Sequence, residues 1–201
     1  MCTHAKKSLN TKIRIMVQNI QTVVRGDAPG LILRGGSGLG KTYHTGKQVK
    51  GTDYVDAPKH SSPLGFYKFV YQYSRKLLVI DDDTGGFSDP KIQSFVKAML
   101  YPNPLTGKNT IAWNSMTKIL EKEGLPEEFD FEGKIIYVCN SLPDNSHTRA
   151  IKSRALTYEI DLSFGERKEL ILLVAKSGIK GLKKNEVVSF RRAYLAEAPS
   201  V

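Results

Sequence analysis

The chain has 201 residues, of which 40% are hydrophobic, and its 30 lysines and arginines against 20 acidic residues give a formal net charge of +10. This length and composition allow one full hydrophobic core with a small appendage, and they exclude a chain that is largely disordered. Because no apolar run is long enough to cross a bilayer and residues 1–7 do not resemble a signal peptide, we expect a cytoplasmic protein with no membrane partner.

The excess of positive charge favours a polyanionic partner, DNA or RNA. A basic surface that only keeps the protein soluble is the alternative. The two cysteines and four histidines are scattered along the sequence and form no cluster with the spacing of zinc ligands. We therefore expect no zinc centre.

The first elements in chain order are a helix and a buried strand. Apolar residues recur at helical spacing from Leu9 to Val24, and the segment 26–30 is typical of a helix end. The apolar run Leu31–Leu33 then predicts a strand. We expect the helix to pack beside the site that follows this strand.

A glycine-rich segment comes next and fits the pattern G-x-x-x-x-G-K-[ST] at every fixed position. In such a loop, backbone N–H groups turn inward on a polyphosphate, the Lys41 ammonium reaches the β- and γ-phosphates, and the Thr42 hydroxyl can hold Mg²⁺. The predicted nucleotide-binding residues are Gly35, Gly36, Ser37, Gly38, Leu39, Gly40, Lys41 and Thr42. A glycine-rich turn that binds nothing is the alternative. The strand before the motif and the helix-compatible residues after it favour a site for ATP and Mg²⁺.

Two helices and a short strand are predicted after the loop. We expect a helix over residues 41–49, a strand over residues 53–56 and a second helix that begins at Pro63 with an apolar face. Lys59 and His60 lie in the loop before this second helix. A cation and an imidazole suit contacts with phosphates, so we predict that these two residues contact nucleic acid.

A continuous apolar run over residues 77–80 leads into three consecutive aspartates. The run is typical of a strand buried in a parallel sheet, and ligands of such sheets collect at the carboxyl ends of the strands. We interpret the segment as a Walker B element in which Asp81, together with Thr42, holds the metal and Asp82 orients the attacking water. An acidic turn that only caps a strand is the alternative.

The next segment is predicted to form a helix with a proline in its first turn, followed by a projecting loop. Residues 105–115 contain a turn signal and a short apolar run, which indicate a loop or a small hairpin. Lys108 and Asn109, beside Trp113, are predicted to contact the backbone and a base of nucleic acid. A packed tryptophan on a solvated hairpin is the alternative.

The remaining core elements are a short helix over residues 116–123, a strand over residues 134–139, a short helix over residues 150–156 and a last strand over residues 158–162. Asn140 follows the first of these strands. Its amide can help to place the attacking water against the γ-phosphate, although an asparagine at a strand end is more often a turn former.

The phosphate loop, the strand with Asp81 and Asp82, the strand that ends at Asn140 and the Ser153-Arg154 dipeptide stand in an order that resembles the AAA+ ATPases. The resemblance covers about residues 8–175 and is greatest to the compact members encoded by phages and mobile elements. It implies an α/β fold, a P-loop NTPase αβα sandwich around a five-stranded parallel sheet, with a small C-terminal helical lid.

The resemblance also implies roles for residues outside the phosphate loop. Asn140 is similar to the sensor-1 residue. Arg154 is similar to the arginine finger that clamp loaders and initiators offer to the γ-phosphate of a neighbouring subunit, and Arg149 competes for that role. Arg191 and Arg192 are candidates for the sensor-2 arginine.

By the same resemblance, the chain assembles with itself into a ring or a helical filament that holds ATP between subunits. We expect the nucleotide-binding core over residues 1–163 and the lid over residues 164–201. Many family members carry glutamate where Asp82 stands. Because aspartate is one methylene shorter, we expect hydrolysis that is slow or that needs the neighbouring subunit to close the site.

The sequence thus predicts a Mg²⁺-dependent ATPase that couples hydrolysis between subunits to the binding or remodelling of nucleic acid, with DNA favoured. Phage or plasmid DNA replication, loading of a helicase partner and DNA movement fit this prediction, in the host cytoplasm if the protein is phage-encoded. A remodeller or adaptor with a polypeptide client is the alternative, but its central loop usually carries an aromatic and an apolar residue. A small-molecule kinase fits less well because it needs neither Asn140 nor Arg154.

Overall fold

The computed structural model describes residues 8–58, 61–82, 89–113 and 119–177. The chain divides into two compact units, one made of residues 15–160 and the other of residues 1–14 with residues 161–201. In the part of the chain that is described, no helix is both long enough and apolar enough to span a membrane.

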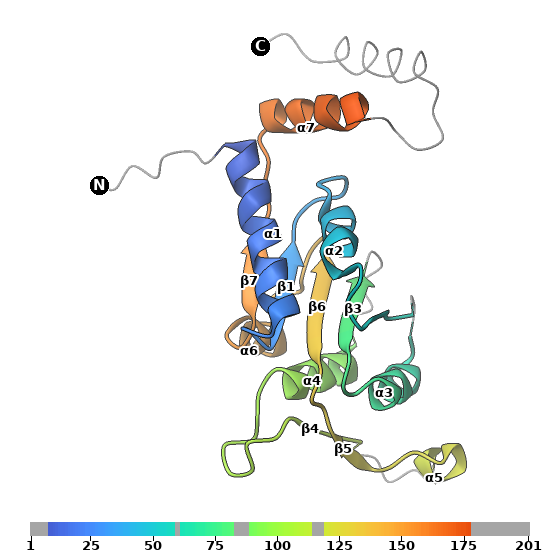
Figure 1. Cartoon of the computed structure of the whole chain (residues 1–201). Helices are drawn as coiled ribbons and strands as arrows, with labels where there is room; N and C mark the ends of the chain where they lie inside the picture. The colour runs from blue at the N-terminus through green and yellow to red at the C-terminus, as the bar shows by residue number, and fades with distance from the viewer. Residues whose placement is uncertain (1–7, 59–60, 83–88, 114–118, 178–201) are drawn as a thin grey trace. The chain divides into compact units, whose positions relative to one another are not determined.

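Five parallel strands form the sheet of the larger unit, in the order β2-β3-β6-β1-β7 (Figure 1). Their bounds are β1 Gly30–Arg34, β2 Tyr54–Asp56, β3 Leu77–Asp82, β6 Lys134–Cys139 and β7 Leu156–Glu159. Strand β6 separates β1 from β3, so the carboxyl ends of these three strands meet at one edge of the sheet. Ligands of parallel sheets bind at such an edge.

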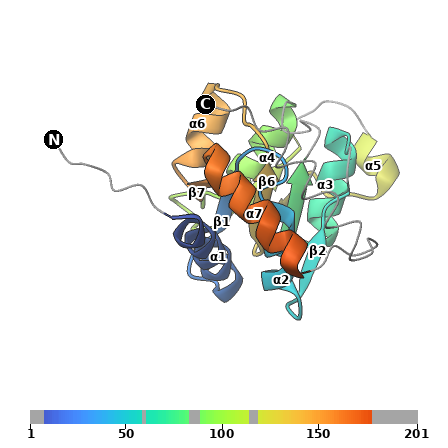
Figure 2. The same cartoon turned by 90° about the horizontal axis from the view of Figure 1, so that it is seen from above.

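Helices cover both faces of this sheet (Figures 1 and 2). The helices described up to residue 160 are α1 Leu9–Arg25, α2 Lys41–Val49, α3 Pro63–Gln72, α4 Pro90–Met99, α5 Ile119–Glu123 and α6 Ser146–Lys152. Helix α2 and the part of α1 from residue 15 onward lie on one face, and α3, α4 and α6 lie on the other. The predicted αβα sandwich with a five-stranded parallel sheet is therefore confirmed.

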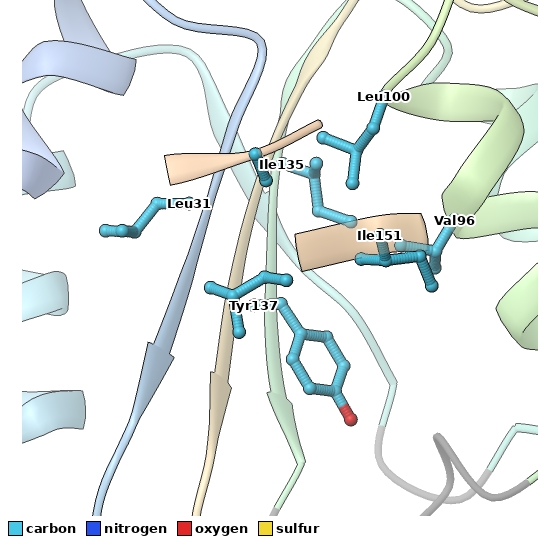
Figure 3. A pocket seen from close by; sticks show the side chains of 8 residues that line it. Leu31, Val96, Leu100, Ile135, Tyr137 and Ile151 are labelled. Carbon is cyan, nitrogen blue, oxygen red and sulfur yellow. The ribbon is translucent and has the colours of Figure 1, made fainter. Parts of the chain in front are cut away.

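The core between the sheet and helices α3, α4 and α6 is built from alternate residues of the strands. Leu78 and Ile80 of β3 belong to it together with Ile135 and Tyr137 of β6. Figure 3 shows Val96 and Leu100 facing these β6 side chains across an apolar hollow that has no room for a water molecule. Because side chains alternate along a strand, the odd-numbered residues of β3 point to the opposite face of the sheet, toward α2.

Residues 105–115 were predicted to form a loop or a small hairpin, and the structure shows a turn followed by a strand whose partner lies outside this segment. Strand β4 (Thr110–Ala112) pairs antiparallel with β5 (Glu128–Asp130), which lies much later in the chain. The turn before β4 closes on itself instead, because the Gly107 amide donates to the Asn103 carbonyl and the Asn103 amide donates to the Lys108 carbonyl. Pairing over such a distance leaves no local signal in the sequence.

Capping residues set the ends of the helices. Pro63 and Pro90 occupy the first turns of α3 and α4, as predicted, and each helix begins after a side chain that caps it. Helix α6 begins at Ser146, earlier than predicted, because Asn145 and Thr148 form a reciprocal capping box. The last strand, β7, also lies earlier than predicted and ends at Glu159.

The smaller unit contains α7 (Phe164–Ser177), which overlaps the first helix predicted for the lid. The Lys12 ammonium lies 2.8 Å from a carboxylate oxygen of Glu166, and the Ser163 amide donates to the same oxygen. The Lys12 ammonium, followed by this amide, lowers the pKa of Glu166 to about 2, so its carboxylate stays ionised at any physiological pH. The sensor-2 candidates Arg191 and Arg192 lie outside the described residues.

Candidate nucleotide site

The phosphate loop connects β1 to α2, and its backbone geometry requires glycine at two of its fixed positions. Gly35 has a φ of 152°, and a Cβ atom there would lie 2.3 Å from the carbonyl oxygen of Ile160. Gly40 has a φ of 80° and is the residue before the first turn of α2. These two positions let the chain leave the sheet, turn, and enter the helix within a few residues.

We expect Gly35→Ala to lower the free energy of unfolding by at least about 2 kcal/mol, because alanine would carry backbone strain and would meet the Ile160 carbonyl. Gly36→Ala is the matched control. The nearest heavy atom to its new Cβ would be Leu39 Cδ1 at 3.9 Å, so we expect a change within about 0.5 kcal/mol. Urea unfolding of both variants measures the difference. Equal stability of the two would contradict this account of the loop.

Lys41 connects the phosphate loop to the end of β6. Its ammonium donates to the carbonyl oxygens of Gly35 at 2.7 Å and of Gly36 at 2.8 Å, and to the Asn140 amide oxygen at 3.0 Å. The Lys41 side chain is buried, with 6% of the residue exposed. The structure therefore brings together Lys41 and Asn140, which were predicted from separate parts of the sequence, at the edge where β1 and β6 end.

An open cleft of about 620 Å³ lies over the loop. Its lining residues are Ser37, Gly38, Leu39, Gly40, Lys41, Thr42, Tyr43 and Asn140. Predicted phosphate-binding residues make up most of this set. Tyr43 is the member that sequence reasoning missed, because an aromatic residue in the first turn of a helix carries no signal of its own.

The carboxyl end of β3 supplies the predicted carboxylates. Asp81 pairs in register with Val138, and Asp82 pairs with Cys139, directly before Asn140. By the alternation along β3, Asp81 lies on the face of the sheet that α2 covers. Its Oδ1 atom is buried and has no hydrogen-bond partner among the described residues. Asp83 lies outside those residues.

An unpartnered buried carboxylate oxygen at this edge suits a divalent cation or one of its water ligands. Hard cations such as Mg²⁺ prefer oxygen ligands and retain several waters. Thr42 is exposed at the start of α2 and lines the cleft, so its hydroxyl is open to a ligand. The residues present therefore fit the Mg²⁺ that a phosphate loop implies.

Arg154 does not lie near the phosphate loop of its own chain. It precedes β7, whose first residue, Leu156, pairs with Leu31 at the start of β1, whereas the loop follows the end of β1. Four residues of strand correspond to roughly 13 Å. Its guanidinium donates to the Ala150 carbonyl and stacks over the ring of Tyr101 at 4.5 Å.

The competing arginine, Arg149, is exposed on α6 and pairs with Asp144 at 3.4 Å. An exposed pair of this kind contributes little to stability. The structure thus leaves Arg149 accessible, whereas it holds Arg154 against a helix carbonyl and an aromatic ring.

The residues predicted to contact nucleic acid lie apart from the cleft. Lys59 and His60 are outside the described residues. Lys108 pairs with Asp130 at 2.6 Å, and Asn109 donates its amide to the Met99 carbonyl. Both line a second cavity, of about 450 Å³, which lies beside the amino ends of β1 and β6.

Trp113, predicted either to stack on a base or to pack, has its ring within an aromatic cluster. Its ring centroid lies 5.4 Å from that of Tyr67 and 5.9 Å from that of Phe95. The Lys91 ammonium lies 3.4 Å from the centroid of the Trp113 ring. These contacts favour the packed alternative.

Comparisons with known proteins give distant likenesses. No protein-family model matches the chain. An uncharacterized 36.7 kDa protein of Enterobacteria phage T4, from the nrdC-mobD intergenic region, is 26% identical over 186 residues, which cover 84% of this chain and 55% of that protein. The chain therefore spans about half the length of this curated relative.

A solved structure of a DNA replication initiation factor is also similar to this chain, with a TM-score of 0.45 and 15% sequence identity. The likeness covers 96% of this chain and 61% of that one. The assignment of the chain to the P-loop class rests on its own loop and strand order.

Proposed function

We propose that the chain is a Mg²⁺-dependent ATPase of the AAA+ type that acts on nucleic acid as an oligomer. The observation that carries the proposal is the convergence of Lys41, its loop and Asn140 on one cleft at the carboxyl edge of the sheet. Loop amides and the start of α2 would cradle the phosphates, as helix N-termini do for anions. Similarity to a phage protein supports a phage or mobile-element origin.

Each residue of the site has a role in this proposal that follows from its chemistry. Lys41 would move from the loop carbonyls onto the β- and γ-phosphates, since a phosphate oxygen is the stronger acceptor for an ammonium. Thr42 and Asp81 would hold Mg²⁺, which supplies charge neutralisation when bound. Asp82 would accept a proton from the attacking water, and Asn140, released by Lys41, would orient that water.

We expect Asp82→Asn to retain ATP binding but to lower turnover by about 10²-fold or more, the usual effect of losing a positioned base. Asp56→Asn is the matched control, because Asp56 ends the neighbouring strand β2 and is exposed. Phosphate release and nucleotide binding are measured on the same preparations. If Asp82→Asn turns over like the parent chain, the base lies elsewhere, with Asp83 the first residue to examine.

An oligomer follows from the position proposed for the arginine finger. Arg154 lies at the opposite end of the sheet from the phosphate loop of its own chain, so it can serve a γ-phosphate only from a neighbouring subunit. The assignment of residues 164–201 to a lid stays a prediction. A ring and a helical filament both satisfy this geometry.

Nucleic acid is the partner that the charge of +10 favours. DNA replication, helicase loading or DNA movement would use such a partner. Because Lys108 already pairs with Asp130, its positive charge is partly neutralised, and we place more weight on the loop with Lys59. Contacts through the phosphate backbone would make binding insensitive to sequence.

We expect the chain, with an ATP analogue, to bind DNA with an affinity that falls steeply as salt rises, because each phosphate contact releases counterions. Lys59→Glu should weaken binding to unrelated sequences alike, and Lys59→Arg should preserve it. Fluorescence anisotropy at several salt concentrations measures both effects. Absence of DNA and RNA binding at low salt would reject this partner and favour a polypeptide client.

A further inference from the structure

Tyr43 is a large aromatic residue that lies exposed beside the phosphate loop. It follows Thr42 in the first turn of α2, has 67% of its surface exposed, and lines the cleft of about 620 Å³. The other lining residues are small, polar or part of the loop. Tyr43 is therefore the aromatic surface that this cleft offers to a ligand, among the residues that the structure describes.

The neighbouring His44 restrains the Tyr43 ring. The two rings meet edge to face, with centroids 5.2 Å apart and an interplanar angle of 83°. His44 is itself half-buried against the loop, since a Cβ atom on Gly40 would lie 3.2 Å from its Cδ2. The Tyr43 ring thus lies against the edge of a half-buried neighbouring ring.

The order of groups along the loop gives the direction of a bound nucleotide. The Lys41 ammonium lies with Gly35, Gly36 and Asn140, which is the end that takes the β- and γ-phosphates. The first amides of α2 would then bind the phosphate nearer the sugar, since the N-terminus of a helix binds anions. The sugar and base must then leave the loop past the first turn of α2, where Tyr43 lies.

We infer that Tyr43 is the surface on which the base of the bound nucleotide stacks; this inference rests on the proposed function. Stacking on an aromatic ring tolerates any base, since every base has a π face. Two other cavities of the described residues do not compete. The apolar hollow of Figure 3 has no room for water, and the cavity at Lys108 lies beside the amino ends of β1 and β6.

The test compares two ligands that share a phosphate chain, ATP and inorganic tripolyphosphate, each with Mg²⁺. We expect Tyr43→Ala to weaken ATP binding by between about fivefold and 100-fold, the range for loss of one aromatic–base stack, and to leave tripolyphosphate binding unchanged. Tyr43→Phe should bind ATP like the parent chain. Tyr71→Ala, which removes an exposed tyrosine of α3, is the matched control.

The outcomes separate this inference from the proposed function. If the parent chain binds neither ligand, the nucleotide site itself is absent and both proposals are rejected. If the parent chain binds ATP and Tyr43→Ala weakens both ligands equally, or neither, Tyr43 does not contact the base although the site stands. Thermal unfolding of Tyr43→Ala and of a second variant, Tyr43→Leu, shows whether the fold is retained; both variants should then give the same ligand preference.

Discussion

Replacing Lys41 by alanine is expected to abolish measurable ATP binding while the chain remains folded. The ammonium would otherwise donate to two phosphates, and charged hydrogen bonds of this kind contribute about 1.5–3 kcal/mol each. Their loss corresponds to roughly 10²- to 10⁴-fold in affinity. Titration calorimetry with ATP and Mg²⁺ measures the loss.

Lys47→Ala is the matched control, because Lys47 lies exposed on the same helix and its removal should leave ATP binding unchanged. The carbonyl oxygens of Gly35 and Gly36 lose their donor in Lys41→Ala, so we expect a moderate fall in stability, which urea unfolding measures. Tight ATP binding by a folded Lys41→Ala chain would overturn the assignment of the phosphate loop.

The second large effect is expected at Arg154. An arginine finger supplied by a neighbouring subunit can contribute about 10³ to 10⁵ in rate, so Arg154→Ala should bind ATP normally and lose nearly all hydrolysis. Lys152→Ala is the control, since Lys152 ends α6 two residues before Arg154 and carries the same charge. Phosphate release at a fixed chain concentration measures both variants.

Mixing two inactive variants makes the test specific for a neighbouring subunit. Arg154→Ala has an intact phosphate loop, and Lys41→Ala has an intact arginine, so a mixed oligomer contains some complete sites. Recovered hydrolysis would place Arg154 in the neighbour's site. No recovery despite demonstrated co-assembly would reject that role, and exchanging Arg149 would be the next experiment.

Much of the sheet and of the loop could be predicted because their signals are local. Strands β3 and β6 contain continuous apolar runs of the kind that parallel sheets bury on both faces; the run of β3 leads into Asp81, and β6 is followed by Asn140. The phosphate loop has a fixed spacing that its glycine conformations require. Pro63 and Pro90 marked two helix starts for a similar reason, because proline fits the first turn of a helix.

Features that depend on contacts between distant segments could not be predicted. The pairing of β4 with β5 depends on residues more than a dozen positions apart, with helix α5 between them in the chain. The start of α6 was misplaced for a different, local reason: the capping box at Asn145 lies before the apolar residues that indicated the helix. The bond between Lys41 and Asn140 follows from strand order, which puts β6 beside β1.

The central claim, that this chain hydrolyses ATP at the cleft over its phosphate loop, is tested most directly by phosphate release from ATP. We predict release by the parent chain that requires Mg²⁺, is abolished in Lys41→Ala, and rises per subunit as chain concentration increases. The same measurement is repeated with DNA, the proposed partner, added. ATP binding with no release of phosphate at any chain concentration, with or without DNA, would contradict the account.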